Sequence, residues 1–124
     1  MSDEKQRVAV LGASTNPERY SNKAILRLLE NGHEVVPVHP ALDEVEGLRV
    51  VPNLNAIDGA VDTLTMYVSP KLSTKMADAI LDLKPGRVIF NPGTENAELQ
   101  SALGEAGIPT LEACTLVLLA TGQF

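Results

Sequence analysis

The sequence has few aromatic residues, one cysteine and no tryptophan. Aromatic residues make up 3% of its 124 residues and hydrophobic residues 44%, so aliphatic side chains must fill the core. The lone Cys114 excludes an internal disulfide bond and is typical of a reducing compartment. Together with His33 and His39 it matches no spacing of metal ligands. We therefore expect neither a disulfide framework nor a metal site.

Positive charge and long apolar runs are also scarce. The formal net charge is -6, which argues against nucleic-acid binding because such proteins normally present a basic face. The longest apolar run, ACTLVLLA, is too short to span a bilayer. The charged start, MSDEKQ, is followed by no stretch that resembles a signal peptide. We expect a cytoplasmic protein without nucleic-acid or membrane partners, with a flexible tail over residues 1–6.

Apolar segments that are typical of buried strands alternate with segments that have helical periodicity. Strands are predicted over 7–11, 34–38, 62–68, 87–90 and 108–112, and helices begin near 21, 70, 95 and 113. Strands that alternate with helices indicate a parallel sheet with right-handed crossovers. We therefore expect one domain over residues 1–124. It is predicted to be an α/β, Rossmann-like three-layer sandwich around a mainly parallel five-stranded sheet.

Residue types near the helix ends predict how each helix begins. Ser21 or Asn22 is expected to cap the first helix, and Ser69 the second, with Pro70 at its first position. Leu72 is expected on the buried stripe of that second helix. Residues 41–58 are less clear, with a short strand in EGLRVVPNL and a helical turn over 54–57.

In sheets of this kind, ligands bind beyond the carboxyl ends of the strands. The segment after the first predicted strand, GASTNPERYSNK, begins with Gly12, which permits close approach of the backbone to a ligand. It continues with short polar side chains, with Arg19 and Lys23, and with a helix N-terminus whose free N–H groups favour an anion. This pattern predicts a phosphate or pyrophosphate site, and an ordinary solvated loop is the alternative.

The same segment disfavours NAD. A dinucleotide fingerprint requires G-x-G-x-x-G, and the run from Gly12 reads GASTNP. The fingerprint also requires an acid after the second strand, where this chain has His39 and Pro40. The longer loop over 13–20 leaves room for a bulkier or differently bent nucleotide.

Four segments carry a family resemblance and together cover nearly the whole chain: VAVLGASTNPERYSNKAILRLLENGHEVVPVHP, VDTLTMYVSPKLS, RVIFNPGTENAEL and AGIPTLEACTLVLL. In their order and spacing the chain resembles the small CoA-binding proteins related to the N-terminal domain of the succinyl-CoA synthetase alpha subunit. The resemblance implies a Rossmann-like domain with CoA or acyl-CoA lying over its loops. Many relatives have Asn-Pro-Lys where this chain has His39, Pro40 and Ala41, so a phosphate-binding lysine is absent here.

The resemblance also implies a set of binding residues, carried over position by position. They are Gly12, Ala13 and Ser14 along the nucleotide, Arg19, Ser21, Asn22 and Lys23 near the phosphates, Val38 and Pro40 beside the adenine, Val68, Ser69, Pro70 and Lys71 on the opposite wall, and Asn91, Pro92 and Gly93 toward the pantetheine. His39 lies at the same strand end. It could donate to a phosphate or stack on adenine, or be an ordinary turn histidine.

Motifs of catalysis are missing: the sequence has no G-x-S-x-G and no Walker loop. Cys114 is either a thiol at a helix start or a small core residue. Tyr67 faces either the expected cleft or the core, and His33 is expected to face solvent. We predict a CoA or acyl-CoA binding protein without its own catalytic machinery.

Other functions remain open alternatives. One is an enzyme or accessory subunit that acts on a CoA thioester, and another is a sensor of a different nucleotide. The apolar segment TLVLLATGQF, residues 115–124, is a candidate contact for a homodimer or a partner protein.

Overall fold

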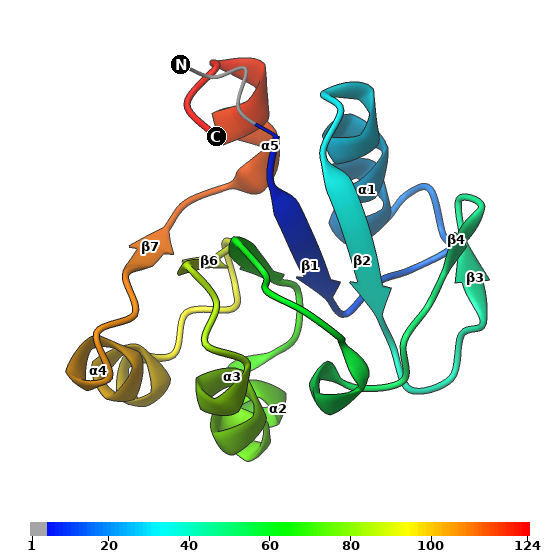
Figure 1. Ribbon diagram of the computed structural model, residues 1–124. Helices are drawn as coiled ribbons and strands as arrows, with labels where there is room; N and C mark the ends of the chain where they lie inside the picture. The colour runs from blue at the N-terminus through cyan, green and yellow to red at the C-terminus, as the bar shows by residue number, and fades with distance from the viewer. Residues whose placement is uncertain (1–4) are drawn as a thin grey trace.

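The computed structural model describes residues 5–124 of the chain. Its main sheet contains β1 (Arg7–Leu11), β2 (Glu34–Val38), β5 (Thr63–Met66), β6 (Arg87–Phe90) and β7 (Thr110–Glu112). These strands lie in the order β2-β1-β5-β6-β7, and each neighbouring pair is parallel (Figure 1). The predicted α/β, Rossmann-like fold with a five-stranded parallel sheet is confirmed. Residues 1–4, the larger part of the predicted tail, lie outside the described residues.

Helices cover both faces of the sheet, which makes three layers (Figure 1). One face carries α1 (Tyr20–Glu30) and α5 (Thr115–Ala120), and the other carries the 3-10 turn η1 (Leu54–Ala56), α2 (Pro70–Lys75), α3 (Ala77–Leu83) and α4 (Ala97–Glu105). Successive side chains of a strand point to opposite faces. Val8 and Val10 of β1 therefore pack on the α1 side, while Ala9 and Leu11 join the cluster on the other face.

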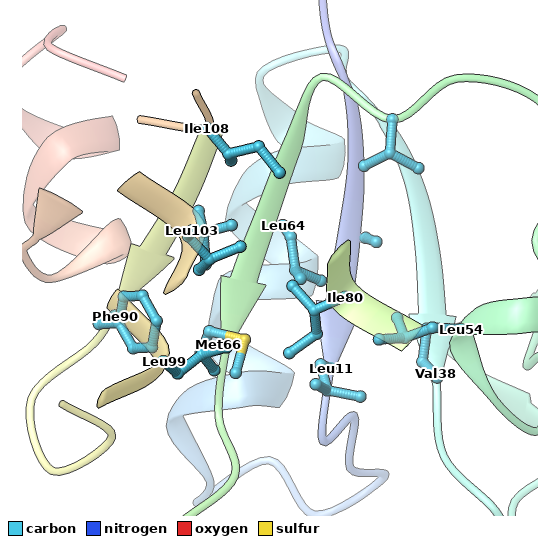
Figure 2. Packing of buried hydrophobic residues seen from close by; sticks show 13 residues of the cluster. Leu11, Val38, Leu54, Leu64, Met66, Ile80, Phe90, Leu99, Leu103 and Ile108 are labelled. Atoms are coloured by element: carbon cyan, nitrogen blue, oxygen red, sulfur yellow. The ribbon is translucent and has the colours of Figure 1, made fainter. Parts of the chain in front are cut away.

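The larger core cluster fixes α3 and α4 against the sheet. Figure 2 shows Leu64 and Met66 of β5 and Phe90 of β6 close to Ile80 of α3 and Leu103 of α4, and all five side chains are fully buried. Burying one side chain of this size contributes about 1.5–3 kcal/mol. This packing makes the sheet a rigid base for the loops that follow its strands.

A small hairpin stands beside the main sheet. It consists of β3 (Glu44–Val45) and β4 (Leu48–Arg49), which pair antiparallel. Its two turn residues, Glu46 and Gly47, have positive φ angles of 51° and 78°, the backbone that tight two-residue hairpins require. The expected short strand in this region is therefore one arm of a hairpin, and the expected helical turn is η1.

The second predicted helix is two helices, because Met76 ends α2 and also precedes α3. Ser69 caps α2 and Pro70 occupies its first turn, as expected. The prediction that Leu72 is buried is wrong, since its side chain is 46% exposed. Ser73 takes the inward position instead, because Asn96 donates to the Ser73 hydroxyl at 2.8 Å. The N-cap residue of α4 thus bonds to the inward face of α2.

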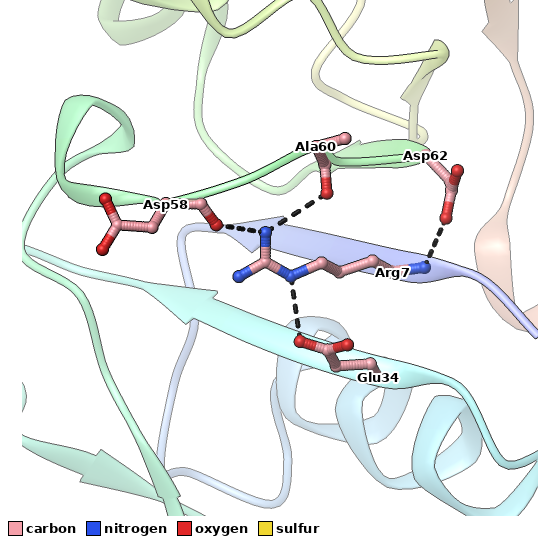
Figure 3. Close-up of polar contacts among 5 residues, drawn as sticks. All are labelled: Arg7, Glu34, Asp58, Ala60 and Asp62. Carbon is pink, nitrogen blue, oxygen red and sulfur yellow. Dashed lines mark hydrogen bonds and ion pairs between the residues drawn. The ribbon is translucent and has the colours of Figure 1, made fainter.

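Hydrogen bonds from Arg7 join three segments at the amino end of the sheet. Figure 3 shows its side chain paired with Glu34 at 2.9 Å and donating to the backbone carbonyls of Asp58 and Ala60. Its backbone N–H donates to the Asp62 carboxylate at 2.7 Å. This end of β1 is therefore tied to β2 and to the segment before β5.

His33 lies at the same end, and the expectation that it faces solvent is wrong. Its side chain is 7% exposed, and its ring lies 5.1 Å from the ring of Phe124. Its Nδ1 accepts a hydrogen bond from the backbone N–H of Gln6 at 3.1 Å. Burial, followed by the positive charges of Lys5 and Arg87, lowers the pKa of His33 below 6.5.

The C-terminal segment is partly core. α5 lies beside α1, and Leu119 and Phe124 pack against the cluster on that face, while Val117 is 55% exposed. The partner contact expected through residues 115–124 stays a prediction. Across residues 5–124, no helix has the length and apolarity needed to cross a bilayer.

Candidate functional site

A cleft of about 940 Å³ opens at the carboxyl ends of β1, β2 and β5. β1 lies between β2 and β5, so the loops that leave β1 and β5 diverge to opposite faces of the sheet. A crevice at this switch in strand order is where open α/β sheets bind ligands. The cleft is lined by residues 11–14, 19–21, 38–40, 52–54, 67–69 and 92–94 and by Leu72, Met76 and Ala79.

Gly12 determines how closely β1 and β5 approach at the floor of the cleft. Its φ is +93°, and a Cβ at this position would lie 2.8 Å from the backbone oxygen of Tyr67. Its N–H donates to the Val38 carbonyl at 3.1 Å, and the neighbouring N–H of Ala13 donates to the same oxygen. A side chain at residue 12 would therefore push the first and third cleft loops apart.

The loop from β1 to α1 is held by its own short polar side chains. The Ser14 hydroxyl accepts from the Asn16 N–H at 3.0 Å, and the Asn16 side chain accepts from the Glu18 N–H at 2.9 Å. The Asn16 carbonyl also accepts from the Arg19 N–H. These bonds fix a compact loop beside the cleft.

The N-terminus of α1 begins one residue earlier than predicted, and its cap differs. Arg19 is the N-cap and makes no side-chain capping bond, so the expectation that Ser21 or Asn22 caps the helix is wrong. Both residues lie inside the first turn and are buried, because the loop places Arg19 at the boundary. In the part of the chain that the structure describes, no side chain caps this helix start, which leaves its first N–H groups open to an anion.

The structure gathers most of the predicted binding residues around the cleft. Its lining includes Gly12, Ala13, Ser14, Arg19, Ser21, Val38, His39, Pro40, Val68, Ser69, Pro92 and Gly93. The predicted residues outside the lining are Asn22, Lys23, Pro70, Lys71 and Asn91. They differ in surroundings, since Asn22 and Asn91 are buried and the other three are exposed.

Asn91 is part of a buried hydrogen-bond network under the loops. Its amide nitrogen donates to the Thr65 hydroxyl at 2.7 Å and to the Met66 carbonyl at 2.8 Å. Its amide oxygen accepts from the Thr115 N–H at 2.9 Å. Through these bonds Asn91 fastens the end of β6 to β5 and to the start of α5, and Pro92 follows it at the cleft.

Sequence reasoning missed several cleft residues, most of them apolar. They come from the end of β1, the start of α1, the η1 region, the α2–α3 wall and the loop after β6: Leu11, Tyr20, Pro52, Asn53, Leu54, Leu72, Met76, Ala79 and Thr94. Tyr20 is 68% exposed, with the Lys23 ammonium 5.5 Å from its ring centre. The signal in the sequence was an aromatic residue, Tyr20, directly after the basic Arg19 at a helix start. Composition alone does not distinguish such a residue from an ordinary exposed one.

His39, Tyr67 and Cys114 have different positions. His39 lines the cleft, and its Nδ1 accepts from the Ala41 N–H at 3.0 Å, so its Nε2 carries the proton of the neutral ring and can donate. Tyr67 borders the cleft but packs with the cluster on the α1 face, and burial raises the pKa of Tyr67 to about 12. Cys114 precedes α5 and is outside the cleft lining.

The charge of the cleft differs from that of the whole chain. Among residues 5–124 its lining contains Arg19 and no Asp or Glu, although the net charge of the protein is -6. A ligand anion at the start of α1 therefore meets a cation and a positive helix end. A carboxylate also lies near this helix start, that of Glu46, which is outside the lining and accepts from the Asn22 side chain at 3.1 Å.

Comparison with known families agrees with this geometry. The family model of the CoA binding domain matches residues 6–120. The chain belongs to this family. The predicted family resemblance is thus confirmed, and the expected binding of CoA is supported at the level of the family.

Individual relatives agree with this placement. The chain is 29% identical over 102 residues to uncharacterized protein YneT of Bacillus subtilis (strain 168), covering 82% of this chain and 76% of that protein. A crystal structure of an uncharacterized protein superposes with a TM-score of 0.92 at 43% identity, covering 98% of this chain and 99% of that one.

A more distant neighbour shows the same fold within a larger protein. It is the dinucleotide forming acetyl-coenzyme A synthetase 1 of Ca. Korarchaeum cryptofilum, solved in complex with phosphate and ADP. The TM-score is 0.75 at 22% identity, and the match covers 87% of this chain and 25% of that chain.

Proposed function

We propose that the protein binds CoA or an acyl-CoA in the cleft at the β1–β5 switch and has no catalytic machinery of its own. The observation that carries the proposal is the position of this cleft in a chain of the CoA binding domain family. Its loops come from the ends of β1, β2, β5 and β6, the edge of the sheet where such folds hold nucleotides.

The phosphate end of the proposed ligand belongs at the start of α1. This helix has no side-chain cap and no acid among its own first-turn residues, so an anion can complete its N–H groups. Arg19 is exposed beside this end and lines the cleft. The Nε2–H of His39, directly after β2, supplies a second donor.

The apolar part of the cleft suits the remainder of such a ligand. Leu72 is 46% exposed while lining the cleft, and Leu54, Met76 and Ala79 lie along the same wall. An apolar lining with a few polar groups at one end is typical of cofactor sites. Covering Leu72 would remove apolar surface from water.

The absence of catalysis is proposed from the side chains that line the cleft. Among the described residues, His39 forms no hydrogen bond with Ser14, Ser21, Ser69 or Tyr67 that would make a nucleophile and base pair. His39 instead accepts from a backbone N–H. An activated nucleophile needs an adjacent base within hydrogen-bond reach.

Isothermal titration and thermal-shift measurements with CoA, acetyl-CoA, 3′-dephospho-CoA, NAD and ATP test the proposal. We expect CoA and acetyl-CoA to raise the melting temperature, because a ligand of the folded state stabilises by about 2.7 kcal/mol at a hundredfold excess over its Kd. NAD is expected to give no shift.

Two arginine variants at opposite ends of α1 locate the site. Arg19→Ala is expected to weaken CoA binding by about tenfold through loss of one charge-assisted contact. Arg27→Ala removes the same charge from an exposed pair with Glu30 outside the cleft lining, and we expect no change in affinity. No binding of CoA or acetyl-CoA at millimolar concentration would reject the proposal. A shift with ATP or NAD alone would favour a sensor of another nucleotide.

A further inference from the structure

Asn22 connects the cleft loop to a distant part of the chain. It lies in the first turn of α1 and its side chain is completely buried. Its amide nitrogen donates to the Ser14 carbonyl at 2.8 Å and to Glu46 Oε2 at 3.1 Å. Within residues 5–124 its Oδ1 has no hydrogen-bond partner. The side chain is therefore oriented by the two bonds of its nitrogen.

Glu46 reaches this buried amide from the turn of the β3–β4 hairpin, next to which the β1–α1 connection passes (Figure 1). Its backbone has a φ of +51°, a left-handed conformation that is unfavourable for a residue other than glycine. Glu46 is exposed, so water can solvate its carboxylate without the contact to Asn22. The strained turn nevertheless brings the carboxylate to the start of α1.

The two contacts form a chain of hydrogen bonds from the hairpin to the cleft. Ser14 lines the cleft and Glu46 does not. Ser14 also accepts from the Asn16 N–H, so the position of its backbone affects the loop up to Arg19. If the Glu46 contact is lost, Asn22 has one partner left, and the Ser14 carbonyl is held less firmly.

We propose that Glu46 is a positioning residue of the cleft. Through Asn22, it holds the Ser14 carbonyl and so keeps residues 13–19 in the conformation that a ligand meets. This inference rests on the proposed function of the cleft, but the state of the loop can be measured without any ligand. The hairpin thereby serves as a brace for the loop that follows β1.

Hydrogen exchange of the free protein tests the brace. In Glu46→Ala we expect faster exchange of the hydrogen-bonded amides of the loop, on the order of tenfold for one lost bond to a charged acceptor. These are the amides of Ala13, Asn16, Glu18 and Arg19. Glu46→Gln keeps an oxygen that can accept from Asn22 and is expected to exchange like the wild type. Glu44→Ala is the matched control, since it removes the same charge from the same hairpin. We expect no change there.

Titration with CoA supplies the second readout. Glu46→Ala is expected to weaken CoA binding on the order of tenfold, and Glu46→Gln to restore wild-type affinity. Unchanged exchange in Glu46→Ala would overturn the inference, as would faster exchange with unchanged CoA affinity. If the wild type itself does not bind CoA, the proposed function fails. The exchange comparison then decides alone whether Glu46 holds the loop.

Discussion

The two ends of the parallel sheet satisfy their polar groups in different ways. At the amino end, Arg7 bonds to a carboxylate and two carbonyls, and Arg87 donates to the carbonyl of Phe124 at 2.9 Å. Gln6 and His33 complete this end with a further bond. At the carboxyl end, the loops surround a cleft of about 940 Å³ with an uncapped helix start.

This difference places the proposed binding and the hydrogen bonds of Arg7 and Arg87 at opposite ends of the sheet. Hydrogen bonds made inside the protein stabilise the folded state, whereas donors left open at the cleft are available to a ligand. Gly12 bears on both stability and the cleft, because it makes a tight packing contact and also lies at the base of the cleft. Substitutions at the two ends should therefore change different measured quantities.

A large effect on stability is expected at the floor of the cleft. Gly12→Ala should lower the free energy of unfolding by about 3 kcal/mol, because the backbone is left-handed and the new Cβ would contact the Tyr67 oxygen at 2.8 Å. Gly93→Ala has a similar φ of +90° and open space around the Cβ, so only about 1 kcal/mol of backbone strain is expected. Urea unfolding measures both, and equal costs would contradict the steric argument.

A smaller effect is expected at the amino end. Arg7→Ala should lower the free energy of unfolding by about 1–2 kcal/mol through loss of its bonds to Glu34 and to two carbonyls. CoA affinity should stay unchanged, since this residue lies at the end opposite the cleft. Arg27→Ala breaks an exposed pair and should cost at most about 0.5 kcal/mol. A loss of CoA binding in Arg7→Ala would show that the two ends are coupled.

The wall of the cleft should tolerate truncation that the core does not. Leu72→Ala is expected to cost less than about 1 kcal/mol of stability, because the side chain is already 46% exposed. It should weaken CoA binding severalfold if the ligand covers it. Ile80→Ala, on the neighbouring helix and fully buried, should cost about 2–5 kcal/mol. A Leu72 variant as destabilised as the Ile80 variant would contradict the exposure of Leu72 at the wall of the cleft.

The smallest effect is a pH dependence at the amino end. The pKa of His33 is lowered from 6.5 in the folded protein, so the unfolded chain binds the proton more readily. The stability that neutral His33 contributes is fully present above about pH 6.5 and is lost as the pH falls through the folded pKa.

The variant His33→Asn isolates this dependence. Its side-chain oxygen can still accept from the Gln6 N–H, but it does not titrate. Between about pH 7.5 and pH 5, the melting temperature of the wild type should fall further than that of the variant. Parallel pH curves would show that His33 does not contribute to the difference between the two ends.

Local patterns in the sequence predicted the elements well. The apolar run over 7–11 and the strand over 34–38 match β1 and β2 in their bounds, because a fully buried parallel strand needs apolar side chains on both faces. Ser69 before Pro70 predicted the start of α2, since a cap acts within its own turn. Two strands and one helix are shorter than expected. β5 covers 63–66 and β7 covers 110–112, where 62–68 and 108–112 were predicted, and α5 covers 115–120 rather than beginning near 113.

Residues whose partners are distant in sequence were predicted poorly. His33 packs against Phe124, and Leu72 is exposed while its neighbour Ser73 is buried and accepts from Asn96. Asn22 was expected as a possible cap, but it lies inside the first turn of α1, and its amide bonds to Glu46 from the hairpin. Periodicity shows which side chains share a face of one element, but it does not show what packs against that face.

The sequence by itself determined the order of strands and helices, the parallel sheet and the segments that meet beyond its carboxyl ends. These follow from hydrophobic period and from the handedness of the crossovers. The tertiary structure decided which of the segment residues face the cleft, that the amino end is closed by hydrogen bonds, and that a hairpin braces the loop after β1. Those outcomes depend on contacts between residues far apart in the chain, and a folded chain alone brings such residues together.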